Sequence, residues 1–131
     1  MSIYITKFEE SDFSAIQALN KIEGWSSLVH NWDETKRAWQ NSNVSFVAKE
    51  HGEIVGYIRG MTDESVTLYV CEILVHPKHR GKGIGRQLLK HSHQRYPTTR
   101  MEMLATKKSS TYYEGLGFRL FYGFRKTFEE K

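Results

Sequence analysis

A predicted buried strand that leads into a glycine-rich turn constrains the fold of this 131-residue chain more than any other feature. Residues 66–75 form a nearly continuous apolar run, which is typical of a central strand covered on both faces. Residues 80–85 (RGKGIG) follow shortly afterwards, and residues 83–95 have the apolar spacing of a helix. The sequence therefore predicts a strand, a tight turn and a helix in succession.

The remaining elements are expected around this unit. A helix capped by Ser11 or Asp12 should end at Gly24, where glycine suits the left-handed cap. The chain after Trp25 is expected to be irregular until Asp33, a plausible cap for a short helix. The other expected elements are a first strand from Ile3, a hairpin of residues 43–49 and 53–60 turning at His51-Gly52, a turn at Asp63-Glu64, a strand at 100–105, a helix at 109–116 closed by Gly117, and one or two strands at 118–128. This order predicts one α/β (α+β) domain over residues 1–131, with a mixed sheet covered by helices.

Composition narrows the class of protein. With 39% hydrophobic and 13% aromatic residues the chain is expected to be globular. No apolar run approaches the roughly 20 residues that cross a bilayer, so no membrane partner is expected. A single cysteine, Cys71, fits a reducing compartment and predicts a cytoplasmic protein. The net charge of +4 suggests an anionic partner, either a nucleic acid or a phosphate-bearing cofactor.

The turn at residues 80–85 favours the cofactor. Its alternate glycines, Gly81, Gly83 and Gly85, allow the backbone to approach a ligand closely. Main-chain N–H groups at the start of the following helix suit a diphosphate. The dinucleotide fingerprint is excluded because position 86 is Arg, and a Walker loop is excluded because Lys82 is followed by Gly83. A plain strand-to-helix connection remains the alternative.

Two longer segments resemble one known family. Residues 72–89 (EILVHPKHRGKGIGRQLL) resemble the cofactor-binding motif of the GNAT superfamily of acetyl-CoA-dependent N-acetyltransferases. Residues 112–118 (YYEGLGF) resemble its Tyr-Glu-Lys-x-Gly-Phe signature, with Gly115 where Lys is common. The resemblance implies a mostly antiparallel central sheet flanked by helices, acetyl-CoA as co-substrate, and a central strand that separates from its neighbour at a bulge.

The resemblance also assigns cofactor-binding positions. The main chain of the strand would hold the pantetheine arm, and the turn with its basic residues would hold the diphosphate. Thr106 and Ser109 occupy positions where the family often has Asn and Ala. The expected cofactor-binding residues are Ile73, Leu74, Val75, Arg80, Gly81, Lys82, Gly83, Ile84, Gly85, Arg86, Thr106 and Ser109.

Acyl transfer to an amine requires a group that accepts the amine's proton. An alkylamine with an ordinary pKa is neutral in only about one molecule in a few thousand at pH 7. Glu72 is the candidate catalytic base or amine ligand, because a carboxylate in an apolar strand is costly unless it is paired or used. An ion pair with Arg59 on the preceding strand is the structural alternative.

The resemblance identifies Tyr113 as the second catalytic candidate, the residue that would protonate the leaving thiolate. A packed aromatic with a satisfied hydroxyl is the alternative, and its neighbour Tyr112 is expected in the core. Cys71 has no histidine partner in the sequence, so we expect direct transfer in a ternary complex instead of an acyl-cysteine.

The remaining expectations concern ligands and partners. No metal site is predicted, because the six histidines lack the spacing and partners of a ligand set. Trp25, Trp32 and Trp39 are expected either in the acceptor pocket or in the core or a dimer contact. We expect a small-molecule amine substrate and, from the resemblance, a homodimer. Two rival functions stay open: a non-catalytic acyl-CoA sensor of the same fold and, ranked last, a basic nucleic-acid-binding module.

Overall fold

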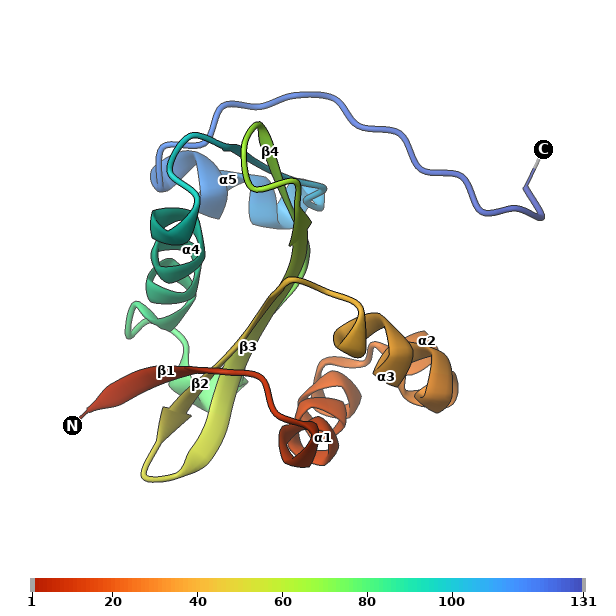
Figure 1. Cartoon of the computed structure of the whole chain (residues 1–131), viewed down its shortest axis with the longest axis vertical. Coiled ribbons are helices and arrows are strands. Elements are labelled where there is room, and N and C mark those ends of the chain that lie inside the picture. Colours follow the sequence, from red (N-terminus) through yellow and green to blue (C-terminus); the bar gives the residue numbers. More distant parts are fainter. Residues whose placement is uncertain (1, 131) are drawn as a thin grey trace.

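The computed structural model describes residues 2–130 and contains a five-stranded sheet with helices on both faces (Figure 1). Its strands are β1 (Ile3–Lys7), β2 (Val44–Glu50), β3 (Glu53–Thr62), β4 (Thr67–Val75) and β5 (Arg100–Met103). Its α-helices are α1 (Phe13–Glu23), α2 (Ser26–His30), α3 (Trp32–Gln40), α4 (Ile84–Arg95) and α5 (Lys107–Gly115), with single 3-10 turns at Glu10–Asp12 and Pro77–His79.

The strands lie in sequence order, and all neighbours are antiparallel except β4 and β5. The β2–β3 turn places His51 and Gly52 at positive φ (53° and 81°), the conformation that tight hairpins require. The parallel β4–β5 pair follows from the intervening α4, because a crossover returns the chain in the same direction. The predicted mixed, mostly antiparallel sheet is confirmed.

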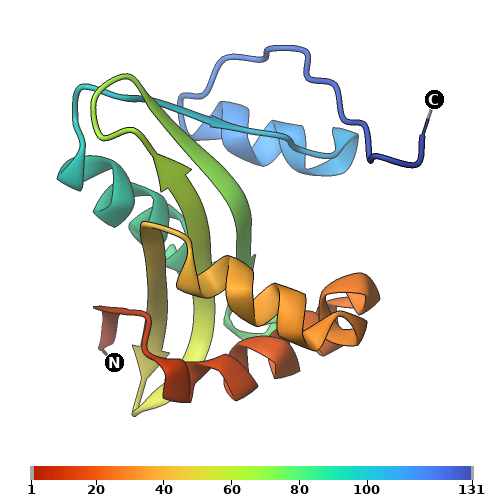
Figure 2. The same ribbon diagram turned by 45° about the vertical axis from the view of Figure 1, so that its right-hand side comes forward.

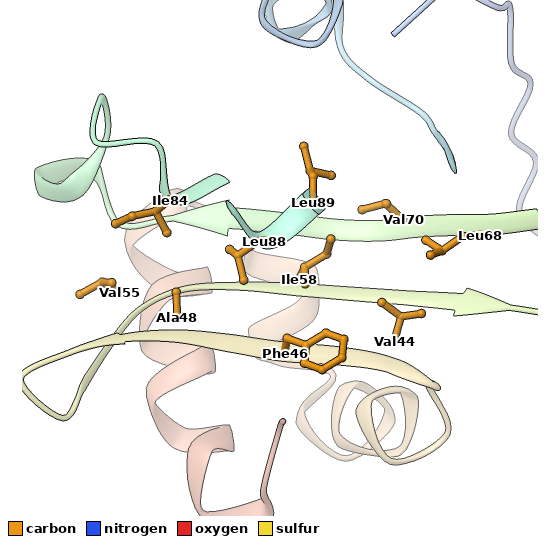
Figure 3. Close-up of a cluster of buried hydrophobic side chains, with 10 residues drawn as sticks. All are labelled: Val44, Phe46, Ala48, Val55, Ile58, Leu68, Val70, Ile84, Leu88 and Leu89. Atoms are coloured by element: carbon orange, nitrogen blue, oxygen red, sulfur yellow. The ribbon is translucent and has the colours of Figure 1, made fainter. Parts of the chain in front are cut away.

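The sheet separates two hydrophobic cores. On one face, α4 lies against β2, β3 and β4, and Ile84, Leu88 and Leu89 pack onto buried strand residues (Figure 3). On the other face, α1 and α3 supply Phe13, Ile16, Leu19 and Trp39. Figures 1 and 2 show α1, α2 and α3 gathered on the side of the sheet opposite α4. A strand with helices on both faces must be apolar on both, and β4 has that character.

Several predicted boundaries are wrong. The segment after Trp25 is helical (α2), and α3 begins at Trp32, so Asp33 lies inside its first turn and does not cap it. Asp12 precedes α1 but its side chain makes no cap; instead it accepts a hydrogen bond from the Glu9 amide at 2.9 Å and pairs with Lys49. Short helices of this kind are stabilised by tertiary contacts, which local sequence signals do not encode.

The predicted strand or strand pair at residues 118–128 is also wrong. The chain from Phe118 to Phe128 forms no strand in the described structure. The sequence there is rich in strand-forming aromatics, but a strand needs a neighbouring strand to satisfy its backbone groups, and none lies beside it. None of the helices within residues 2–130 combines the length and the apolar composition that a membrane span requires.

Candidate active site

The two strands at the centre of the predicted site separate halfway along β4. The β4–β5 ladder ends at the pair Val70↔Met103. Residues 71–75 continue alongside β3 but have no strand neighbour on the β5 side in the described structure. Backbone groups that face this side lack ladder partners, so they are available to an extended ligand that adds to the strand.

An irregularity in β4 marks the point of separation. Arg59 pairs with Glu72 and Gly60 pairs with Val70, so Cys71 is an extra residue in β4. Gly60 is required opposite this bulge, because a Cβ there would lie 2.5 Å from the Tyr69 carbonyl oxygen. Bulges bend a strand and increase its twist, which accounts for the loss of pairing with β5 just beyond.

The glycine-rich turn connects β4 to α4 through two left-handed residues. Gly81 and Gly83 have φ of 82° and 81°, and a Cβ at either position would meet no atom within 4 Å. Gly83 is the residue before α4, so the amides of the first helical turn have no acceptor within the helix. They lie at the positive end of α4, beside the open space at the Cβ positions of Gly81 and Gly83, and this setting suits a diphosphate.

Gly85 differs from these two glycines. It lies within α4, and a Cβ there would come within 2.8 Å of the Tyr112 hydroxyl oxygen. Tyr112 therefore rests on the glycine turn, with its ring 49% exposed, and the expectation that it belongs to the core is wrong. Burial raises the pKa of Tyr112, and the nearby positive charge of Arg86 opposes that rise. Sequence reasoning missed the contact of Tyr112 with Gly85, because this contact depends on how α5 packs against α4.

Arg80 connects the turn to the helices on the opposite face of the sheet. Its Nε donates to the Val75 carbonyl oxygen at 3.0 Å, and its terminal nitrogen pairs with the Glu23 carboxylate at 2.5 Å. Glu23 is the last residue of α1. Arg80 thus fixes the end of β4 against α1, and its charge is already partly balanced.

Glu72 and Arg59 form a bidentate ion pair at the bulge. Nε and a terminal nitrogen of Arg59 donate to the two carboxylate oxygens of Glu72, both at 2.7 Å. A further Arg59 nitrogen donates to the Ser42 hydroxyl at 3.1 Å. Burial acts to lower the pKa of Arg59, but the hydrogen bonds and charge of Glu72 outweigh it and raise that pKa above its ordinary value. The ion pair named above as the structural alternative is therefore present, and a catalytic role for Glu72 stays a prediction.

Tyr113 lies beside the α4 core. It is half-buried and packs against that core. Its ring makes edge contacts with the rings of Tyr112 and Phe118, at distances between ring centroids of 5.1 Å and 5.8 Å. Burial, followed by the neighbouring Tyr112, raises the pKa of Tyr113, so its phenol stays protonated at neutral pH. A protonated phenol is the form that can donate a proton to a leaving group.

Thr106 and Ser109 cap α5. The Thr106 hydroxyl accepts from the Ser109 amide at 3.2 Å, and the Ser109 hydroxyl accepts from the Thr106 amide at 3.1 Å. This reciprocal capping box satisfies two amides of the first turn. Both residues therefore have a structural role at the start of α5. Their contact with the cofactor remains a prediction.

The other singled-out side chains have structural partners. Trp39 is buried between Phe8 and Tyr57, which places it in the core. Next to the turn, the His76 ring accepts a hydrogen bond from the Lys78 amide, whereas His79 Nδ1 lies 3.2 Å from the Glu50 carboxylate but makes no hydrogen bond. Residues 2–130 contain no group of three side chains placed to hold a metal ion.

Cys71 is half-buried at the bulge. Burial raises the pKa of its thiol, although the charge of Arg59 opposes that rise. A thiol with a raised pKa carries little thiolate at neutral pH and is a poor nucleophile.

A buried chain of hydrogen bonds, which sequence reasoning missed, fixes the helices on the Glu72 side. The Tyr57 hydroxyl donates to Asn20 at 2.5 Å, Asn20 donates to Gln17 at 2.8 Å, and Gln17 donates to the Leu28 carbonyl oxygen at 2.9 Å. Burial, followed by the charge of Glu72, raises the pKa of Tyr57, so its hydroxyl is neutral.

A groove of about 400 Å³ lies between α1 and the β2–β3 turn. None of the predicted site residues lines this groove, so we do not assign the chemistry to it.

Comparison with known proteins adds independent observations. The family model described as acetyltransferase (GNAT) domain matches residues 41–120. A segment of 50 residues is 38% identical to L-2,4-diaminobutyric acid acetyltransferase of Virgibacillus pantothenticus, and it covers 37% of this chain but only 31% of that relative. Two solved structures share the fold. One is a GNAT-family acetyltransferase of Streptococcus pneumoniae TIGR4, with a TM-score of 0.82 and 23% identity; the match covers 98% of this chain and 100% of that one. The other is a GNAT-family protein of Xanthomonas campestris pv. campestris, with a TM-score of 0.74 and 20% identity; the match covers 92% of this chain and 86% of that one.

Proposed function

This chain belongs to the GNAT family of acetyltransferases, and from that premise we propose that it transfers the acetyl group of acetyl-CoA to a primary amine of a small molecule. The observation that carries the proposal is the free side of β4. Five residues of β4 (71–75), which have no strand partner on the β5 side, lead through a short connection into a turn whose amides suit a diphosphate. A coenzyme with an extended amide-containing arm and a diphosphate presents matching groups in that order.

The residues present fit acetyl-CoA. The main chain of Ile73 and Val75 would bind the pantetheine arm as a short added strand, with Leu74 between them in the same stretch of β4. The amides from Gly81 to Arg86 would bind the diphosphate, with Lys82 and Arg86 adding positive charge. When bound, acetyl-CoA supplies a thioester whose carbonyl carbon is open to attack by an amine. Because Cys71 is a poor nucleophile here, the acetyl group would pass directly to the amine within a ternary complex. The new C–N bond would replace the C–S bond, and Tyr113 would protonate the departing coenzyme A thiolate.

Glu72 is proposed to receive the proton of the amine, directly or through water. Its carboxylate lies at the bulge where β4 leaves β5, which is next to the proposed site of the thioester. Arg59 holds both carboxylate oxygens in a fixed orientation, so an ammonium group can approach only their remaining lone pairs. Such an arrangement orients the base, and holding amine and thioester together supplies much of the rate.

The size of the acceptor is inferred from the local relative. Diaminobutyrate carries two primary amines on a small skeleton, and the matched segment spans about a third of that enzyme. We therefore propose small diamines and amino acids with a side-chain amine as the first substrates to test. A cytoplasmic location is proposed from the single cysteine, which suits a reducing compartment.

A panel of amines with acetyl-CoA and a thiol-detecting readout tests the function. Panel members are diaminobutyrate, linear diamines, arylalkylamines and a lysine-containing peptide. Thiol release above the rate without amine, together with acetylated product by mass spectrometry, is the expected result. Acetyl-CoA binding measured by calorimetry without turnover of any amine would contradict the enzyme assignment.

That contrary outcome would instead support a non-catalytic acyl-CoA sensor. One observation favours this second candidate: both oxygens of the Glu72 carboxylate at the bulge are already bound to Arg59. A sensor would keep its coenzyme affinity in the double variant Tyr113→Phe plus Glu72→Gln and would show no loss of cellular function.

Removing the Tyr113 hydroxyl should slow turnover without loosening coenzyme binding. Tyr113→Phe is expected to lower kcat by about 10- to 100-fold, in the range of general acid catalysis or below it. Tyr112→Phe is the matched control, because it deletes the same atom one residue away and at the glycine turn. Equal effects of the two variants on kcat, or an effect of Tyr113→Phe on acetyl-CoA affinity alone, would contradict the proton-donor role.

A further inference from the structure

A buried carboxylate and a histidine ring face each other where the chain enters the glycine-rich turn. Glu50 is the last residue of β2, and only 8% of its side chain is exposed. His79 is the last residue of the 3-10 turn that leads into the glycine-rich turn, and its side chain is 25% exposed. The two side chains approach to 3.2 Å, measured from His79 Nδ1 to Glu50 Oε1. Neither of them takes part in the proposed acetyl transfer.

Both side chains contain a buried polar atom that is unsatisfied. Within residues 2–130, Glu50 Oε2 and His79 Nδ1 have no hydrogen-bond partner, although Nδ1 lies close to the other oxygen of the carboxylate. A buried carboxylate is costly unless a donor or a positive charge meets it. A protonated histidine ring provides both, because each of its nitrogens then carries a hydrogen. The two groups are therefore placed to form an ion pair when His79 takes up a proton.

The position of the glycine-rich turn depends on the residues that precede it. Gly81 and Gly83 have no side chains, and no atom lies within 4 Å of their Cβ positions, so side-chain packing does not fix them. Arg80 connects the start of the turn to α1 through its ion pair. His79 is the residue before Arg80, and a bond to Glu50 would connect the same point to β2. Such a second connection would restrict the turn further.

We propose that Glu50 is a positioning residue for coenzyme binding and that it acts through the protonation of His79. With His79 protonated, the two side chains pair and hold the glycine-rich turn in the conformation that binds the diphosphate. With His79 neutral, the pair loosens and the affinity for the coenzyme falls. This role rests on the proposed function, since it requires the turn to bind coenzyme A. Because the protonated protein binds more tightly, coenzyme binding must in turn favour proton uptake at His79.

The sign of the pH dependence follows from this linkage. Affinity should be highest at the acid end of the range in which histidine titrates, and it should fall as the pH rises through that range. Other histidines near the pair change charge in the same range and need controls. The titratable and charged side chains around the pair are Lys7 on β1, Lys49 next to Glu50, His51 and Glu53 in the β2–β3 hairpin, His76, Lys78 and Arg80 next to His79, and His91 and Arg95 on the α4 face that packs on β2.

Calorimetric titration across the histidine range tests the proposal. The probe is dephospho-coenzyme A, which keeps the diphosphate but lacks the 3′-phosphate, a phosphomonoester that itself titrates near about pH 6. From about pH 5.5 to about pH 8 the affinity is expected to fall by about three- to tenfold, since one unit of pKa corresponds to a factor of ten. At about pH 7, titrations in PIPES and in Tris should give different binding enthalpies, because the buffer supplies the proton that the complex takes up.

Glu50→Gln and His79→Gln should each remove the pH dependence and the proton uptake. Both variants keep much of the side-chain volume, and Glu50→Gln also removes a buried charge, so the fold is expected to survive. The double variant should bind no more weakly than the weaker single variant, because all three lack the same pair. The controls are His51→Gln, His76→Gln and His91→Gln, which remove the other histidines around the pair and should each retain the pH dependence.

The possible failures of the proposal are distinguishable. An affinity that does not change with pH, or that still changes in both Glu50→Gln and His79→Gln, would overturn the proposal. Loss of the pH dependence in His76→Gln alone would assign the effect to that ring and would contradict it as well. If neither coenzyme A nor dephospho-coenzyme A binds at any pH, the coenzyme site itself is wrong, and the proposed function fails together with this inference.

Discussion

Gly83→Val is expected to abolish measurable coenzyme A binding while the protein remains folded. The side chain of residue 83 would project into the open space in front of α4, where a Cβ now meets no atom within 4 Å. In the proposed complex that space holds the diphosphate. Loss of two charge-assisted hydrogen bonds from the first-turn amides corresponds to an affinity loss of about 100-fold or more. Calorimetric titration with coenzyme A measures the change.

The variant also carries a backbone cost that needs its own control. Residue 83 has φ of 81°, a conformation that costs an L-residue at least about 1 kcal/mol. Gly52→Val is matched, because Gly52 has the same φ of 81°, has free space around its Cβ position, and lies in the β2–β3 turn outside the predicted site. It should lose similar stability yet bind coenzyme A normally. Undiminished coenzyme affinity in folded Gly83→Val would place the diphosphate elsewhere.

Glu72→Gln is expected to lower kcat/KM by about 100-fold or more, the usual contribution of a positioned base. Glutamine keeps the length of the side chain but cannot accept a proton at neutral pH. It also weakens the bidentate pair with Arg59, and leaving one partner of a partly buried ion pair uncompensated costs about 2 kcal/mol of folding stability. Activity is therefore compared at a temperature where thermal unfolding shows both proteins to be folded.

Arg59→Gln separates catalysis from structure. This variant breaks the same ion pair but leaves the Glu72 carboxylate in place. If Glu72 accepts the amine proton, Glu72→Gln loses much more activity than Arg59→Gln at comparable stability. Should the two variants lose activity and stability in parallel, and the double variant lose no more than either, Glu72 would serve only as the partner of Arg59.

Local sequence patterns were sufficient to predict those features in which one backbone conformation requires one type of residue. The apolar run of β4, the left-handed glycines at 24, 52, 81 and 83, and the inward face of α4 were predicted because each depends on a few neighbouring residues. The glycine turn was located for the same reason. α2 was missed, since a five-residue helix gains its stability from contacts with α1 and α3 that lie outside any local window.

The sequence suggested candidate side-chain pairs but could not show which of them form. The Arg59–Glu72 pair depends on the register between β3 and β4, and the bulge at Cys71 sets that register. Tyr112 and Tyr113 are neighbours in sequence, and only the packing of α5 shows that Tyr112 rests on Gly85 while Tyr113 lies against the core. A one-residue shift in either element would exchange these contacts, and no local signal carries that information.

The glycine turn, the buried central strand and the family follow from short sequence motifs, because each motif has fixed backbone requirements. Three features required the folded molecule: the point where β4 leaves β5, the carboxylate oxygens that Arg59 binds, and the lack of a strand beside residues 119–128. A strand, an ion pair or a sheet edge is completed by a partner that is distant in the chain, so local motifs do not encode it.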